Sequence, residues 1–277
     1  MTNLTEIVID IRPQTEFLQG HKQGSVHFDG LASLSERQYE LPETQQAMMM
    51  VHNTTQTLEL QAWVQSKGYN KVQFQLWSEA FEQQLKQDHE FATGKSLAYA
   101  WRPSALVRRF VEQVSAPKDR VLVRGLDIGC GSGRDLVYLA MHGWQMTGID
   151  LRSEMLEKAQ ALATRQQVSI STWQRDCEQI EDPFSDLADA SVGLIHVARY
   201  LHRPIFPVFN RLLAPHGYMV YHTFMQGCEV FGSPNNPGFL LAPYELAKVF
   251  SDYQILLDEV ITLADGRPMS AFIARKK

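Results

Sequence analysis

The chain has 277 residues, of which 44% are apolar and 21% are charged, as in a globular protein with a substantial core. Its net charge of −5 comes from 26 basic and 31 acidic residues, with no clustered run of Lys and Arg, which argues against nucleic acid as a partner. No apolar stretch reaches the length of a membrane span, about 18 residues, and the first residues lack the pattern of a signal peptide. We therefore expect a cytoplasmic protein with no membrane partner.

The three cysteines, Cys130, Cys177 and Cys228, show no CxxC spacing. This argues against a disulfide framework and against a zinc site, so we expect no metal.

The first part of the chain has the pattern of a small α/β unit. Residues 6–12 form an apolar run typical of a buried strand, and residues 57–76 predict a helix that ends at Gly68 and is followed by a strand. The glutamine-rich stretch 78–95 has apolar residues at helical spacing. We expect a first domain over residues 1–85 and a connecting helix over residues 86–104.

The remaining residues, 105–277, show a clear alternation of strands and helices. Strands are predicted at 124–130, 145–151, 168–176, 191–199, 217–224, 253–263 and 269–275, and helices at 133–143, 153–166, 205–214 and 243–250. The last of these helices has Pro243 at its expected first position. Seven strands with intervening helices predict an α/β domain with an open, doubly wound sheet.

The stretch "LDIGCGSGRD", residues 126–135, places glycines at 129, 131 and 133. In such sheets ligands bind beyond the carboxyl ends of the strands, and glycines let the backbone turn tightly and approach the ligand. A dinucleotide fingerprint needs GxGxxG, but Arg134 stands in place of its third glycine. A nicotinamide-dependent oxidoreductase is therefore a disfavoured alternative.

Three carboxylates fall at the ends of successive predicted strands. Asp127 precedes the glycine turn, where it would repel a pyrophosphate and attract an ammonium group. Asp150 is in position to accept hydrogen bonds from ribose hydroxyls, and Asp176 could meet an adenine amino group. An amine, a ribose and an adenine together describe S-adenosylmethionine.

Residues 126–159 closely resemble the first two motifs of the class I S-adenosylmethionine-dependent methyltransferases, and the resemblance extends from about residue 98 to the end. "WRPSALV" at 101–107 and "YHTFMQG" at 221–227 are most similar to the small-molecule group that includes tellurite-resistance and thiopurine-type enzymes. The resemblance implies a seven-stranded Rossmann-like methyltransferase sheet and a small-molecule acceptor, with thiols and chalcogen anions as candidates. It implies that the cofactor-binding residues are Arg102, Asp127, Gly129, Cys130, Gly131, Gly133, Asp150, Leu151, Asp176, Cys177 and His196.

The same resemblance implies that residues 86–104 fold over the cofactor as a lid. Arg102 would then pair with the carboxylate of the methionine part, the alternative being a surface arginine at the start of a helix.

Methyl transfer from a sulfonium needs chiefly positioning, which can supply about 7–11 kcal/mol of the barrier. A general base is optional, since a soft anion needs little help. His196 and His222 are the candidate catalytic residues that face the acceptor. The alternative role for each is a hydrogen-bonded residue of the pocket wall that transfers no proton. A protein that binds S-adenosylmethionine for regulation or docking, without turnover, is the alternative function.

The opening residues resemble a rhodanese-like domain over about residues 5–80. The matching positions are Asp10, Arg12, Glu16, Phe17, Gly20, His21, Gly24 and Ser25. Rhodanese catalysis needs a cysteine thiolate in a loop of backbone amides, and the corresponding loop, 51–59, contains none. The implied role is a packing partner of the methyltransferase or a docking surface for another protein.

The purified chain is expected to show no thiosulfate sulfurtransferase activity, because no cysteine occurs before Cys130. Sulfur transfer to cyanide would be measured against heat-denatured protein. Activity above that background would contradict the assignment of a first domain without its nucleophile.

Overall fold

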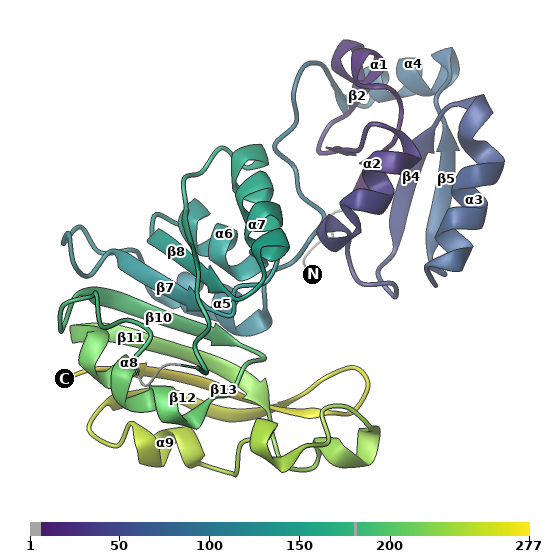
Figure 1. The fold of residues 1–277 in the computed structure, drawn as a ribbon. Coiled ribbons are helices and arrows are strands. Elements are labelled where there is room, and N and C mark those ends of the chain that lie inside the picture. Colours follow the sequence, from purple (N-terminus) through teal and green to yellow (C-terminus); the bar gives the residue numbers. More distant parts are fainter. Residues whose placement is uncertain (1–6, 180–181) are drawn as a thin grey trace. The chain divides into compact units, whose positions relative to one another are not determined.

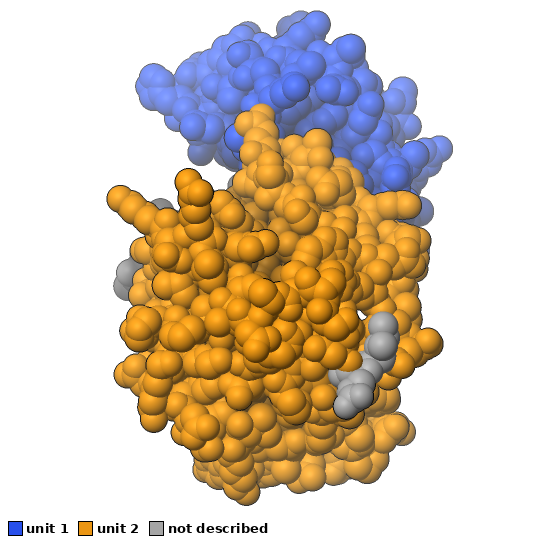
Figure 2. Space-filling model, turned by 60° about the vertical axis from the view of Figure 1, so that its left-hand side comes forward, with its two compact units in different colours: residues 1–102 blue, residues 103–277 orange. Residues whose placement is uncertain are grey.

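The fold is described from a computed structural model, which places residues 7–179 and 182–277. The chain divides into two compact units, residues 1–102 and residues 103–277 (Figure 2). Glu6, the first residue of the predicted strand 6–12, lies outside the described residues. Among the described residues, no helix is long and apolar enough to cross a membrane.

The first unit contains a four-stranded parallel sheet in the order β3-β1-β4-β5. Its strands are β1 (Ile7–Asp10), β3 (Val26–His27), β4 (Met48–His52) and β5 (Val72–Leu76). Around it lie α1 (Gln14–Gln19), α2 (Gly30–Glu36), α3 (Thr57–Ser66) and α4 (Glu79–Gln87), with short 3-10 helices at Gln38–Glu40 and Thr54–Gln56. The sequence did not predict β4. All five of its residues are buried, and β4 pairs with β1 on one side and β5 on the other.

The predicted connecting helix over residues 86–104 is wrong beyond its first two residues. Helix α4 ends at Gln87, and β6 (Phe91–Ala92) then pairs antiparallel with β2 (His21–Lys22) of the first unit. His89 has a positive φ of 60°, which a helix cannot continue through. No further helix occurs before residue 105, and residues 88–102 belong to the first unit.

A buried ion pair joins the last residue of β1, Asp10, to Arg12. Both oxygens of Asp10 accept hydrogen bonds from the guanidinium of Arg12, which also donates to the carbonyl of Gly20 at 2.7 Å. The guanidinium stacks on Trp77, with its carbon 3.5 Å from the ring centroid. Because Arg12 is 1% exposed, this pair fixes the path of the chain from β1 through α1.

The second unit contains the predicted seven-stranded sheet, in the order β12-β13-β11-β10-β7-β8-β9 (Figure 1). Six strands run in the same direction, and β13 alone runs antiparallel, to both of its neighbours β11 and β12. The strands are β7 (Arg124–Ile128), β8 (Gln145–Asp150), β9 (Ser171–Gln174), β10 (Val192–Ala198), β11 (Leu213–Phe224), β12 (Gln254–Thr262) and β13 (Pro268–Arg275).

Helices cover both faces of this sheet (Figure 1). On one face lie α5 (Ala105–Gln113), α6 (Arg134–Met141) and α7 (Ser153–Arg165), and on the other α8 (Phe206–Leu212) and α9 (Glu245–Val249). Short 3-10 helices occupy Arg203–Ile205, Cys228–Phe231 and Pro237–Phe239. Helix α9 does not begin at Pro243 as predicted, because Tyr244 adopts a left-handed φ of 58°.

The two faces of the sheet have separate cores because side chains alternate along each strand. Leu126 and Ile128 of β7 pack in the core that contains α8 and α9. Leu194 of β10 and Val220 of β11 pack in the core that contains α5, α6 and α7. Asp127, between the two apolar residues of β7, therefore faces α6.

Replacing Arg12 with Ala is expected to lower the free energy of unfolding by about 3–5 kcal/mol, because Asp10 is left as a buried, unpaired charge. Lys86→Ala, which removes an exposed ion pair with Glu82 in the same unit, should change it by about 0.5 kcal/mol or less. Denaturant unfolding followed by circular dichroism would measure both. Equal effects of the two substitutions would contradict the structural importance of the buried pair.

Candidate active site

The turn between β7 and α6 follows an inner strand of the second sheet, which lies between β10 and β8. Gly129, Gly131 and Gly133 all have positive φ, at 71°, 54° and 83°. The amides of Gly129 and Cys130 donate to the carbonyl of Ile149 at 2.8 and 2.9 Å, which ties the turn to β8. The glycine turn, residues 129–133, is thus anchored at the carboxyl ends of two neighbouring strands.

Two of these glycines have different surroundings. A Cβ on Gly133 would lie 2.6 Å from the Cβ of Ala159 in α7, so this position must be bare for α6 and α7 to pack. A Cβ on Gly131 would meet no protein atom within 4 Å. Gly131 therefore lies beside open space, where a ligand can approach the backbone closely.

Asp150 ends β8 beside the glycine turn. One carboxylate oxygen accepts a hydrogen bond from the amide of Gly131 at 2.9 Å, and the other accepts from the amide of Arg152 at 3.0 Å. Leu151, next along the chain, is 57% exposed. The structure therefore brings Asp150 to the glycine turn, as the sequence predicts.

Asp176 does not end a strand as predicted. Strand β9 stops at Gln174, and the Asp176 carboxylate accepts a hydrogen bond from the amide of Glu178 at 2.9 Å, which turns the chain. Burial and the charge of Asp176 raise the pKa of the Cys177 thiol to about 11. Burial also raises the pKa of Cys130, so both thiols stay protonated at neutral pH and neither is an activated nucleophile.

The order of the strands reverses at β7, since β8 lies on one side of it and β10 on the other. Such a switch point is where open α/β sheets bind ligands. His196 of β10 lies opposite Asp127 of β7, and Ala198 lies opposite His222 of β11. All three polar residues, Asp127, His196 and His222, project from the face that α6 covers.

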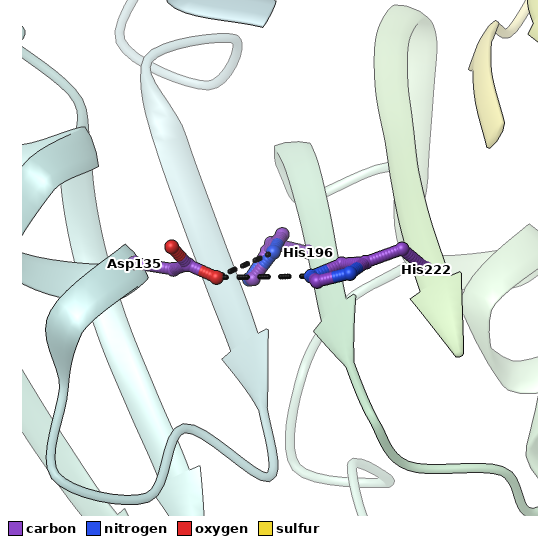
Figure 3. A group of neighbouring side chains, drawn as sticks. All are labelled: Asp135, His196 and His222. Atoms are coloured by element: carbon purple, nitrogen blue, oxygen red, sulfur yellow. Dashed lines mark ion pairs between the residues drawn. The ribbon is translucent and has the colours of Figure 1, made fainter. Parts of the chain in front are cut away.

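These side chains meet Asp135, the second residue of α6, and the four form what we call the buried charge cluster. Figure 3 shows three of its members, Asp135, His196 and His222. The distance from His196 Nδ1 to an Asp127 oxygen is 2.7 Å. Asp135 Oδ2 lies 3.5 Å from His196 Nε2 and 3.8 Å from His222 Nε2. Its other oxygen accepts a hydrogen bond from the amide of Ser104 at 2.6 Å.

Burial and charge act in opposite directions in this cluster. Burial raises the pKa of Asp127, and the nearby His196 offsets the rise only in part. Burial also favours the neutral form of Asp135, but His222 and His196 outweigh it and hold the pKa of Asp135 below its usual value. Burial lowers the pKa of His222, whereas the carboxylates of Asp127 and Asp135 outweigh burial and raise that of His196. The imidazoles and carboxylates therefore stabilise one another.

The cluster corrects the roles predicted for three residues. Asp127 is 2% exposed and bonded to His196, so it does not present a carboxylate to an ammonium group. His196 and His222 are 0% and 5% exposed and lie toward Asp135, so in this structure they are buried rather than facing an acceptor. The reason is the strand alternation, which places all three under α6. Arg102 is exposed and is the last residue of the first unit.

Asp135 was missed by the sequence analysis, although it stands two residues after the last glycine of the turn. The sequence also did not predict a cavity of about 440 Å³. This cavity lies at the amino ends of strands β7, β8, β9 and β10. Its lining residues include Arg124, Trp144, Ser171 and Val192. It is at the opposite edge of the sheet from the glycine turn, so it is not the predicted cofactor site.

Residues 126–217 match a family model described as a methyltransferase domain. The chain is 21% identical to the protein UNK4.09 of Schizosaccharomyces pombe, over 97% of this chain and 93% of that protein. It is 32% identical to YqeM of Bacillus subtilis, which is named as a methyltransferase, over 44% of this chain and 50% of YqeM. Among solved structures, TehB from Haemophilus influenzae is similar at 20% identity and a TM-score of 0.49, over 63% of each chain.

The family match coincides with the glycine turn, Asp150 and β10, and it confirms the enzyme class predicted from the sequence. The comparisons therefore place a methyltransferase domain over residues 126–217, within the second unit of the chain.

Proposed function

We propose that this protein transfers the methyl group of S-adenosylmethionine to a small-molecule acceptor, with thiols and chalcogen anions as the acceptor class. The observation that carries the proposal is the bare backbone at Gly131, which adjoins open space and is bonded to Asp150 at the switch point of the sheet.

The residues at the turn fit the cofactor. A Cβ at position 131 would fill the space that a ligand needs, and Gly131 leaves that space free. A carboxylate can accept about four hydrogen bonds, and the two amide bonds of Asp150 leave it able to accept from ribose hydroxyls. Leu151 would lie against the nucleoside and Asp176 would meet its amino group. When bound, the cofactor supplies an activated methyl group.

The burial of His196 and His222 favours a methyl acceptor that does not have to lose a proton during the reaction. His196 Nδ1 is bonded to Asp127, and His196 is fully buried, so it is poorly placed to take a proton from an incoming molecule. A thiolate or a chalcogen anion attacks without such help. We therefore assign His196 and His222 to the wall that positions the turn and the acceptor, not to proton transfer.

We propose that the first unit is a rhodanese-like module without its nucleophile. Residues at the rhodanese-like positions contact one another in this unit. Arg12 donates hydrogen bonds to Asp10 and to the carbonyl of Gly20, and His21 Nδ1 lies 3.0 Å from the carbonyl oxygen of Phe17. The segment from Asn53 to Gln56 lies between β4 and α3, where a catalytic loop would be expected. Docking of another protein is its proposed role.

The three cysteines are free, which fits a reducing compartment and supports a cytoplasmic location.

Asp150→Ala is expected to weaken binding of S-adenosylmethionine by about 10- to 100-fold, because it removes the charged acceptor for the ribose. Isothermal titration calorimetry with the cofactor and with its demethylated product would measure the loss. Asp252→Ala, an exposed aspartate before β12, is the matched control and should bind as the unmodified chain does.

An acceptor screen that begins with thiols and chalcogen oxyanions follows the binding experiment. Turnover with any of them supports the enzyme, whereas tight binding without turnover across the screen would support the regulatory alternative. No binding by the unmodified chain would overturn the assignment of the glycine turn.

Gly131→Ala and Gly133→Ala are expected to separate binding from folding. Gly131→Ala should cost about 1–2 kcal/mol of stability, from the left-handed backbone alone, yet reduce cofactor binding more than about tenfold, because its Cβ enters the ligand space. Gly133→Ala should cost roughly 2–4 kcal/mol, because its Cβ also collides with Ala159. Denaturant unfolding and calorimetry on both variants check this. Equal stability losses, with binding unchanged in Gly131→Ala, would contradict the two roles.

A further inference from the structure

Three side chains of the buried charge cluster converge in a way that methyl transfer does not require. Asp135, His196 and His222 come from α6, β10 and β11, and one ligand atom from each lies within 4.8 Å of the other two (Figure 3). We propose that these three residues bind a divalent transition-metal cation, with zinc as the favoured ion.

The two distances from Asp135 to the histidines are close to those of a zinc site. Zinc binds nitrogen and carboxylate oxygen at about 2.0–2.2 Å, so two ligand atoms of a tetrahedral site stand about 3.4 Å apart. Asp135 Oδ2 lies 3.5 Å from His196 Nε2 and 3.8 Å from His222 Nε2. A small movement of the side chains therefore suffices to close the three around one ion. A fourth position remains for water or another ligand.

The hydrogen bonds of His196 and Asp135 to their other neighbours leave His196 Nε2 and one Asp135 oxygen free to bind a metal ion. Asp127 accepts from His196 Nδ1, which makes that nitrogen the protonated one and leaves a lone pair on Nε2. The amide of Ser104 holds one oxygen of Asp135 and leaves the other directed at the histidines. Among the described residues, neither His196 Nε2 nor His222 Nε2 has a hydrogen-bond partner, and both atoms are shielded from solvent.

Charge balance favours a divalent ion. With both imidazoles neutral, the carboxylates of Asp127 and Asp135 give the cluster a charge of −2 in a buried site. Unpaired buried charge is costly, and a divalent cation cancels it. Two imidazoles and one carboxylate suit zinc and other transition metals better than magnesium or calcium, which prefer oxygen ligands.

The competing arrangement holds no metal. In it His196 carries a second proton and bonds both carboxylates, although its 3.5 Å separation from Asp135 Oδ2 is long for a charged hydrogen bond. The proposal also replaces the expectation of no metal, which rested on the spacing of the cysteines. It does not depend on the proposed methyl transfer, because metal binding can be measured without any cofactor.

The experiment uses the untagged full chain, stripped with a chelator and dialysed. Zinc chloride would be titrated by calorimetry, and metal content measured by mass spectrometry after gel filtration. We expect about one zinc ion per chain. Asp135→Asn and His222→Gln should each weaken binding more than about tenfold. His142→Gln, an exposed histidine that follows α6, is the matched control and should retain the ion.

Two further measurements cover the case in which a ligand variant fails to fold. Cobalt(II) added to the stripped wild-type chain should give visible absorption bands of four-coordinate geometry, which zinc then abolishes. Asp127→Asn keeps all three ligands and should bind zinc about 10- to 100-fold more weakly, since it no longer fixes the His196 tautomer.

Wild-type chain that binds far less than one zinc ion and gives no cobalt bands would overturn the proposal and favour the protonated His196. Retention of the ion at wild-type affinity by folded Asp135→Asn and His222→Gln would overturn it as well. Cofactor titrations on the same samples distinguish this failure from a failure of the proposed function, since the unmodified chain can bind S-adenosylmethionine whether or not it binds zinc.

Discussion

The second unit depends on a turn that only bare backbone can make. After β7 the chain adopts three positive φ angles within five residues, and its amides bond the end of β8. Gly133 lets α6 pack against Ala159 of α7, while Gly131 keeps space open beside Asp150. The same turn sets where α6 begins and so delivers Asp135 over β10 and β11. The proposed ligand site and the buried charge cluster therefore share one structural origin.

The two faces of the sheet differ in what they bury. The face under α8 and α9 holds an apolar core, whereas the face under α5, α6 and α7 contains two carboxylates and two imidazoles near the carboxyl ends of its strands. Burying such groups is costly unless each has a partner. Asp127 with His196, and Asp135 with the amide of Ser104, supply much of that compensation. Among the described residues, His196 Nε2 and His222 Nε2 are buried without a hydrogen-bond partner, and a bound cation would coordinate both.

The first unit also contains buried charged groups that are paired with one another. Its buried ion pair of Asp10 and Arg12 holds the chain after β1, and Trp77 covers the guanidinium. Asn53 bonds Glu16, which joins the loop after β4 to α1. Residues that carry the rhodanese-like resemblance thus hold the unit together. They can preserve a fold without a nucleophile, because none of these contacts requires a cysteine.

The sequence by itself determined the seven strands of the second unit, the glycine turn and the place of Asp150, because local periodicity and short spacings encode them. It did not reveal β4, which lies between β1 and β5 in the sheet and pairs with both. It also predicted a helix after Gln87, where pairing of β6 with β2 and a positive φ at His89 prevail. The tertiary structure alone decided that Asp127, His196 and His222 lie beneath α6 with Asp135. Those residues are far apart along the chain, and strand register and side-chain alternation, not spacing, bring them together.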